Sequence, residues 1–195
     1  MTTTRRFHLP RLASALWRDC KDDRAAQIVE FALSMPLLVV FVVGIFDFSG
    51  ALTLKQKLTN AARDAARVAA ADPANDLAGS AGVPTSISDA YQVVDNYLLS
   101  ENINDCGLAG TTPTQTGGTL QWVSPALSGC PGGTGLVLTI DRGFLTPQGS
   151  FRLVGTQVTL KYPYRWRFNS VSSLVGGTFT GPTTITTIAT AFNEN

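Results

Sequence analysis

The pattern of apolar and polar positions divides the chain into three parts. Residues 1–24 are polar and basic, and residues 25–72 join a continuous apolar run to an amphipathic helical pattern. Residues 73–195 hold short β-branched runs separated by turns rich in Gly and Pro. This order predicts a tail, a long helix and one α+β domain.

The middle part begins with a candidate membrane span. The run from Phe31 to Phe46 contains no charged residue and is bounded by Glu30 and Asp47. As a helix, its 16 residues would be about 24 Å long, slightly shorter than a hydrocarbon core of about 30 Å. The span is therefore long enough only if the two acids are tolerated near its edges. Pro36 would kink such a helix rather than end it.

A cleaved secretory signal is the competing interpretation of this run. Ser49, Gly50 and Ala51 are small, as a signal cleavage site requires, and cleavage there would leave a mature N-terminus near Leu52. A retained span is favoured because the run is long for a signal and because the helical pattern continues after it.

The pattern from Leu54 to Ala71 is that of an amphipathic helix, which Pro73 would end. Its apolar face is mostly alanine, which allows another backbone to approach closely. The helix could use this face to pack on the chain's own sheet or on other subunits, and both alternatives stay open. The helix-packing positions are Leu58, Ala62, Ala65 and Ala69.

The third part predicts a second helix and an antiparallel sheet. Ser86 and Asp89 have the spacing of a capping box, which predicts a helix over about 87–100. Apolar residues at 120–123 lie among Gly- and Thr-rich loops. Three strand-like runs follow, namely Leu136–Asp141, Phe151–Phe168 and Thr183–Phe192, of which the second forms either two strands or one long bent strand.

Composition and cysteine placement indicate in which compartment the third part of the chain lies. The net charge of +1 gives no reason to expect a nucleic-acid partner, and the third part has the Gly-, Thr- and Ser-rich composition of an exported domain. If that domain is exported, Cys106 and Cys130 can form a disulfide while Cys20 stays reduced. The basic tail favours a cytoplasmic N-terminus.

Candidate catalytic chemistry is scarce. The only histidine is His8, in the basic tail, which excludes a histidine-based nucleophile site in the domain. Three cysteines are too few and too scattered for a zinc site. Asp95, Glu101 and Asp105 could be imagined as paired acids, but we expect them to be solvated. We therefore expect no enzyme, no metal, no cofactor and no small-molecule substrate.

Aromatic and basic residues alternate near the end of the second strand-like run. An extended strand would place the aromatic residues on one face and the basic residues on the other. The aromatic face could be the domain core, or it could meet a partner, a membrane or a nucleic acid. Pro163 indicates an edge strand or a bulge. The alternating residues are Tyr162, Tyr164, Trp166 and Phe168 against Lys161, Arg165 and Arg167.

The N-terminal pattern also resembles a known family. The segment RAAQIVEFALSMPLL from Arg24, the following GIFDFSG and the later LTNAARDAARVAA are similar to the TadE-like family, pseudopilin-like proteins of the Tad (tight adherence) pilus. The resemblance implies a pilin-like α+β fold, with a long helix packed on a small antiparallel sheet. It implies a minor pseudopilin or pilus-assembly protein in the bacterial inner membrane, with other pilus subunits as partners.

The resemblance also implies roles for the residues before the span. Prepilin peptidase would cut between Ala25 and Ala26, so that Glu30 becomes the fifth mature residue and Phe31 the sixth. The family pattern usually has Gly where this chain has Ala25, and some relatives stay uncleaved. In type IV pilins the matching glutamate pairs with the N-terminal amine of a neighbouring subunit. Without the resemblance, the residues fit two roles for Glu30 equally well: a functional carboxylate at the edge of the span, or an acid that lies among the lipid headgroups.

A second function class remains beside this resemblance. The chain could be a single-pass, membrane-tethered binding module that uses the aromatic and basic strand at 161–168. In that case the span would serve only as an anchor.

Overall fold

The computed structural model describes residues 23–77, 82–117, 119–125, 127–130, 135–148, 150–167 and 181–193. Residues 1–22 of the predicted basic tail, with His8 and Cys20, lie outside the described residues, and so does Phe168.

One long helix, α2, runs from Asp23 to Ala71 and contains Pro36 in its interior. It ends before Pro73, as the sequence predicts. The chain divides into two compact units within this helix. The first holds the apolar part up to Phe46, and the second begins at Asp47. The folded domain therefore includes the second half of α2 and starts well before the predicted boundary at residue 73.

The second unit contains two further helical segments and five strands. The 3₁₀ helix η1 covers Ala74–Leu77 and the helix α3 covers Thr85–Ser100. The strands form one sheet in the order β1-β2-β3-β4-β5, and every neighbouring pair is antiparallel. The predicted α+β class with an antiparallel sheet is thus confirmed. The strands are β1 (Thr114–Gln115), β2 (Gln121–Val123), β3 (Val137–Gln148), β4 (Phe151–Pro163) and β5 (Thr184–Phe192).

The sheet differs from the prediction in three places. The apolar residues near 120 form β2 instead of remaining in a loop. Strand β3 continues past Asp141, through an irregularity in its pairing between Asp141 and Phe144. Strand β4 stops at Pro163, so the predicted strand to Phe168 was too long. Pro163 is neither at an edge nor in a bulge: it is the last residue of an interior strand, where its missing N–H costs the ladder little.

The predicted capping box at Ser86 is wrong. Helix α3 begins at Thr85 after Pro84, and no side chain of the N-cap residue makes a capping hydrogen bond. The backbone N–H of Ser86 donates instead to Asp76 Oδ2 of η1, at 2.9 Å. A carboxylate from an earlier turn therefore caps the helix, which local spacing could not reveal.

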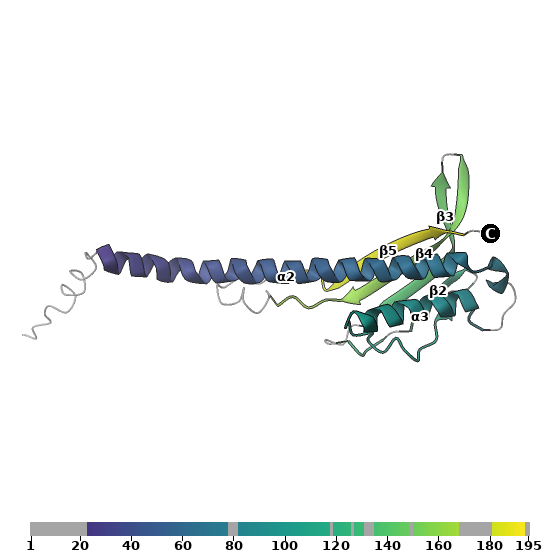
Figure 1. The fold of residues 1–195 in the computed structure, drawn as a ribbon, viewed down its shortest axis with the longest axis horizontal. Coiled ribbons are helices and arrows are strands. Elements are labelled where there is room, and N and C mark those ends of the chain that lie inside the picture. Colours follow the sequence, from purple (N-terminus) through teal and green to yellow (C-terminus); the bar gives the residue numbers. More distant parts are fainter. Residues whose placement is uncertain are drawn as a thin grey trace, which may run out of the picture. The chain divides into compact units, whose positions relative to one another are not determined.

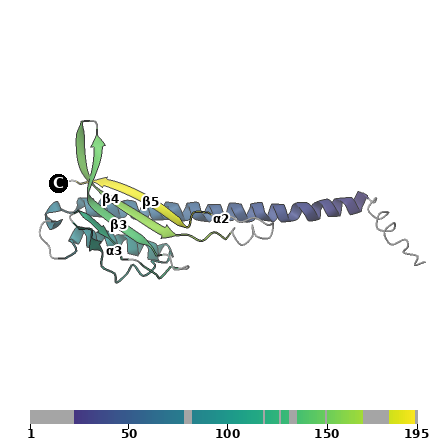
Figure 2. The same cartoon turned by 180° about the vertical axis from the view of Figure 1, so that it is seen from behind.

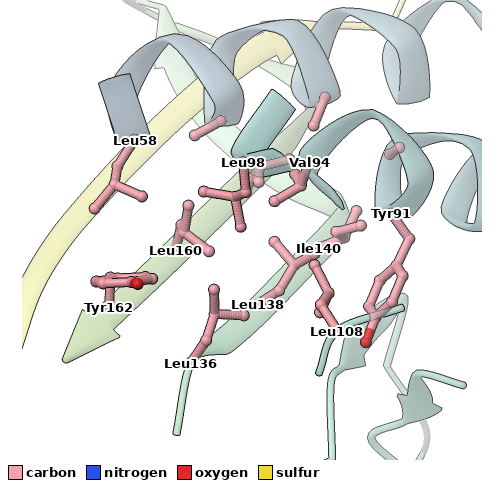
Figure 3. Close-up of a cluster of buried hydrophobic side chains, with 14 of the residues drawn as sticks. Leu58, Tyr91, Val94, Leu98, Leu108, Leu136, Leu138, Ile140, Leu160 and Tyr162 are labelled. Atoms are coloured by element: carbon pink, nitrogen blue, oxygen red, sulfur yellow. The ribbon is translucent and has the colours of Figure 1, made fainter. Parts of the chain in front are cut away.

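The second half of α2 and the whole of α3 cover one face of the sheet. Figure 1 shows both helices in front of the strands, and Figure 2 shows the strands in front of the helices. In the core between these layers, Leu58 of α2 and Leu98 of α3 point toward Leu160 and Ile140 of the sheet (Figure 3). These side chains are all fully buried or nearly so.

The alanine face of α2 is part of this core. Ala62, Ala65 and Ala69 are 0% exposed, so the face packs within the chain. The hydroxyl of Thr187 in β5 lies 3.5 Å from the carbonyl oxygen of Leu58 and donates to it. A strand side chain can reach a helix carbonyl only where the two backbones come close, and alanine permits that approach.

A buried arginine ties the end of α2 to the sheet. Arg142 of β3 is 1% exposed, and its Nη2 donates to the backbone oxygen of Asp72 at 2.9 Å. Burial lowers the pKa of the Arg142 guanidinium, and the charges of Asp76 and Asp72 oppose that shift. The group stays charged at neutral pH because its ordinary pKa is so high. The carboxyl end of α2, η1 and β3 are thereby held together.

A disulfide fastens the loops that follow α3. Cys106 and Cys130 are bonded, with Cα atoms 4.5 Å apart, as the sequence predicts for an exported domain. The backbone N–H of Gly129 donates to the Cys106 carbonyl at 3.2 Å. A Cβ at Gly129 would lie 2.5 Å from that oxygen, so only glycine fits this approach.

Enlarging the alanine face should destabilise the domain. We expect Ala65→Leu to lower the free energy of unfolding by about 1–3 kcal/mol, because the added methylenes have no space between α2 and the sheet. Chemical denaturation followed by circular dichroism measures this loss. The control is Ala71→Leu, at an exposed position of the same helix. Equal stability of the two variants would contradict close packing at Ala65.

Candidate functional site

The first half of α2 is apolar and exposed. Among the described residues it is the one helix that is long and apolar enough to cross a membrane, with a mean hydropathy of 2.5 over its best window and none of that window buried. Phe31, Leu33 and Phe46 are 66%, 75% and 73% exposed. This finding confirms the predicted candidate span.

The predicted processing residues lie in the first turns of this half. Ala25 is within α2, and Ala26, Glu30 and Phe31 are exposed on it. Glu30 is therefore the last charged residue before an exposed stretch of helix that carries no charge up to Phe46.

The acid at the other end of the apolar run is partnered. Asp47 is only 6% exposed, and the hydroxyl of Tyr164 donates to it, with its oxygen 3.0 Å from Oδ1 and 3.1 Å from the backbone oxygen. Burial, the hydrogen bond and the charge of Asp47 raise the pKa of Tyr164 to about 12, against a smaller opposite effect of Arg167. A tyrosine from beyond β4 thus satisfies a carboxylate at the first residue of the folded unit.

Aromatic rings surround this hydrogen bond. The ring centroids of Phe48 and Trp166 are 5.3 Å apart, and those of Tyr164 and Trp166 are 5.0 Å apart in an edge-to-face arrangement. We call Asp47, Phe48, Tyr164 and Trp166 the aromatic cluster.

The start of β5 holds the loop that carries this cluster. Trp166 Nε1 donates to the Pro182 carbonyl at 2.7 Å, and the Tyr164 N–H donates to the Thr183 carbonyl at 2.8 Å. Two hydrogen bonds therefore fix the two aromatic residues of the loop against the chain that leads into β5.

Helix α2, which carries both the span and the buried alanine face, also contains the segment that matches a known family. Residues 25–67 match the family model described as TadE-like protein. The predicted resemblance is thereby confirmed over that segment, and it suggests a protein related to the Tad pilus. Neither the curated proteins nor the solved structures provide a match.

Three of the four predicted helix-packing positions lie within the TadE-like segment and Ala69 lies two residues beyond it, and the structure places all four inside the domain. Leu58, Ala62, Ala65 and Ala69 are all 0% exposed and belong to the core of the chain itself. Of the two alternatives for this face, packing on the chain's own sheet is therefore the one that the fold displays.

The predicted interaction strand is split between different surroundings. Tyr162 is 8% exposed, and its hydroxyl donates to the Asn104 carbonyl at 2.9 Å inside the domain. Tyr164 and Trp166 lie against Asp47 and Phe48, in the turn of α2 that follows the apolar run, while Arg165 and Arg167 are exposed. The single aromatic face that an extended strand would present does not form, because the strand ends at Pro163.

The pairing of Asp47 with Tyr164 was missed at the level of sequence. Asp47 marks the end of the apolar run, and Tyr164 belongs to an unusual aromatic pattern, so both residues carried a signal. They are 117 residues apart, and nothing in either local pattern connects them.

A separate cavity of about 290 Å³ lies between α3 and the loop that follows it. At its wall the hydroxyls of Tyr91 and Thr111 are 2.6 Å apart. Burial raises the pKa of Asp95, and the charge of Asp105 and a hydrogen bond with it add to the rise.

The third acid is elsewhere, since Glu101 pairs with Lys57 at 2.9 Å. The three acids therefore do not form one site, and the expectation that all three are simply solvated was wrong for Asp95. Within the described ranges, no three His, Cys, Asp or Glu side chains are grouped as metal ligands would be.

Removing the hydroxyl of Tyr164 tests its hydrogen bond to Asp47. We expect Tyr164→Phe to lower the free energy of unfolding by about 1–3 kcal/mol, because the buried carboxylate loses a donor. Urea unfolding at neutral pH measures the loss, with Tyr97→Phe on α3 as the control. An unchanged stability would contradict the role of this bond.

The same variant should change the alkaline limit of stability. The folded pKa of Tyr164, about 12, lies above its ordinary value, so its contribution is complete below pH 10 and is lost as the pH rises through 12. Tyr164→Phe should therefore lose less stability over this interval. Burial also raises the pKa values of Tyr91 and Tyr162, so both proteins should still lose some stability at alkaline pH through these two residues.

Proposed function

We propose that the chain is a minor pseudopilin or assembly protein of a Tad-type pilus. It is anchored in the bacterial inner membrane by the first half of α2, and it acts by helix packing and subunit recognition, without catalytic turnover, metal or cofactor. The observation that carries the proposal is the TadE-like segment, half of which is apolar and exposed while the other half is packed on the domain.

The division of α2 indicates which surface would meet other subunits. The alanine face is already occupied by the chain's own sheet, so it has no room for a second helix. The apolar half has no buried residue in its most hydrophobic window, so its large exposed side chains remain available to lipid or to neighbouring helices. Contacts between subunits within the membrane would therefore use residues before Asp47.

Glu30 would give these contacts a fixed position. A carboxylate at the edge of a membrane span is costly unless it finds a partner. If prepilin peptidase cuts before Ala26, the new ammonium group of a neighbouring subunit could pair with Glu30 in a medium of low dielectric constant. Such a pair would set the register between two apolar helices that have no other charged residue between Phe31 and Phe46 to align them.

The charge of the N-terminal tail and the disulfide of the domain support one direction of insertion. The basic tail would remain in the cytoplasm, and the domain with the Cys106–Cys130 disulfide would lie in the oxidising compartment outside the inner membrane.

The alternative, a membrane-tethered binding module, is less well supported. It requires the aromatic residues at 161–168 to face a ligand, but Tyr162 is in the core and Trp166 packs on α2. Of the proposed binding residues, Arg165 and Arg167 remain exposed.

The N-terminus of the protein extracted from membranes tests the proposal directly. We expect intact mass and N-terminal sequencing to give Ala26 if the chain is processed as a pseudopilin. Met1 would indicate an uncleaved assembly protein that stays in the membrane. A mature chain beginning near Leu52 would contradict membrane anchorage altogether.

Replacing Glu30 tests the role of its charge. We expect Glu30→Gln to abolish or strongly reduce pilus assembly while membrane insertion stays normal, because the amide keeps the size of the side chain and removes the charge. The control is Asp64→Asn, which removes the charge of another acid on the same helix. Oδ1 of Asp64 lies 3.6 Å from Nη1 of Arg67. Normal piliation with Glu30→Gln would contradict the pilin-like mechanism.

A further inference from the structure

We propose that the aromatic cluster, with Arg165 and Arg167, is a lipid-binding collar that rests in the headgroup region of the membrane leaflet from which α2 emerges. The collar would bind anionic lipid headgroups through the two arginines. This inference rests on the proposed membrane anchorage, and it assigns a second membrane contact to the folded unit itself.

The length of the apolar run places the membrane boundary at this cluster. The 16 residues from Phe31 to Phe46 span about 24 Å, and a hydrocarbon core of about 30 Å needs roughly four more. On the carboxyl side these would be the residues from Asp47 to Gly50. The side chain of Phe48 is 57% exposed there, so apolar surface does continue past the acid.

The loop after β4 contacts the residues at this boundary. The Tyr164 hydroxyl reaches both Asp47 and the space beside Gly50, where a Cβ would lie 3.5 Å from it. A carboxylate close to hydrocarbon is costly without a donor, and the tyrosine supplies one. The loop thus makes residue 47 compatible with the edge of a bilayer.

The chemistry of the loop is that of an interfacial anchor. Tyrosine and tryptophan gather where membrane spans meet water, because their rings are apolar and their O–H or N–H groups are polar. Tyr164 and Trp166 meet this description, since each makes a polar hydrogen bond while its ring contacts another aromatic ring.

The two arginines have the complementary charge for a lipid surface. Arg165 and Arg167 alternate with the aromatic residues and are exposed. Arginine binds phosphate in a bidentate manner, and basic residues next to a membrane span are attracted by anionic headgroups. The occupant inferred for this surface is therefore the lipid headgroup layer rather than another protein.

Fluorescence of Trp166 in the full-length protein tests the collar. The protein would carry Trp17→Phe and be reconstituted into vesicles of zwitterionic lipid, with or without anionic lipid. Trp122, at 3% exposure, is buried away from lipid quenchers, and a further Trp166→Phe variant gives its emission as the background. Resistance to carbonate extraction is measured separately, so that loss of anchorage is distinguished from loss of the collar.

We expect lipids labelled with a quencher near the headgroup to quench Trp166 and lipids labelled deep in the acyl chain to quench it little. Anionic lipid should strengthen the quenching. Arg165→Gln with Arg167→Gln should abolish that increase, and so should high salt, which screens exposed charges. The matched control, Arg63→Gln with Arg152→Gln, removes two other exposed arginines and should keep the increase.

Three results would overturn the proposal. Trp166 could be untouched by lipid quenchers although the protein resists carbonate, which would leave the proposed function intact. Quenching could be equal with and without the two arginines, which would remove the anionic-lipid contact. The fluorescence of Trp166 could depend on the density of protein in the vesicles instead of on the lipid composition. This result would assign the surface to a second copy of the chain.

Discussion

The close contact between the second half of α2 and the sheet is the interaction on which the rest of the fold depends. Three alanines with no exposed surface let the helix lie low enough for Thr187 to reach the Leu58 carbonyl. Leu58 fills the space toward Leu160 that this approach leaves. Larger side chains would lift the helix, and both the buried leucines and the hydrogen bonds to its backbone would lose their partners.

This packing gives one continuous helix two different environments. Before Asp47 the helix exposes large apolar side chains, and after it the helix buries small ones. The same secondary structure can therefore serve as a membrane element and as a core element, with the change marked by a buried acid. The TadE-like match covers both environments, which indicates that the family pattern describes the helix as a whole and not only its span.

Local patterns predicted the features that local chemistry determines. The apolar run, the end of α2 before Pro73, the α+β class and the antiparallel strands all follow from periodicity and from turn residues. Features made by residues far apart in sequence were missed, because no short pattern contains both partners. Asp76 replaced a predicted cap at Ser86, Arg142 reached Asp72, and Tyr164 reached Asp47.

The long separation between α2 and its sheet partners has a consequence for biogenesis. Leu58 emerges 129 residues before Thr187, and Asp72 emerges 70 residues before Arg142. If the domain is exported as proposed, the helix is complete while the strands that bury its alanine face are still on the cytoplasmic side. The face would then stay uncovered until β4 and β5 have crossed, so the order of translocation would set the earliest moment at which the domain can close.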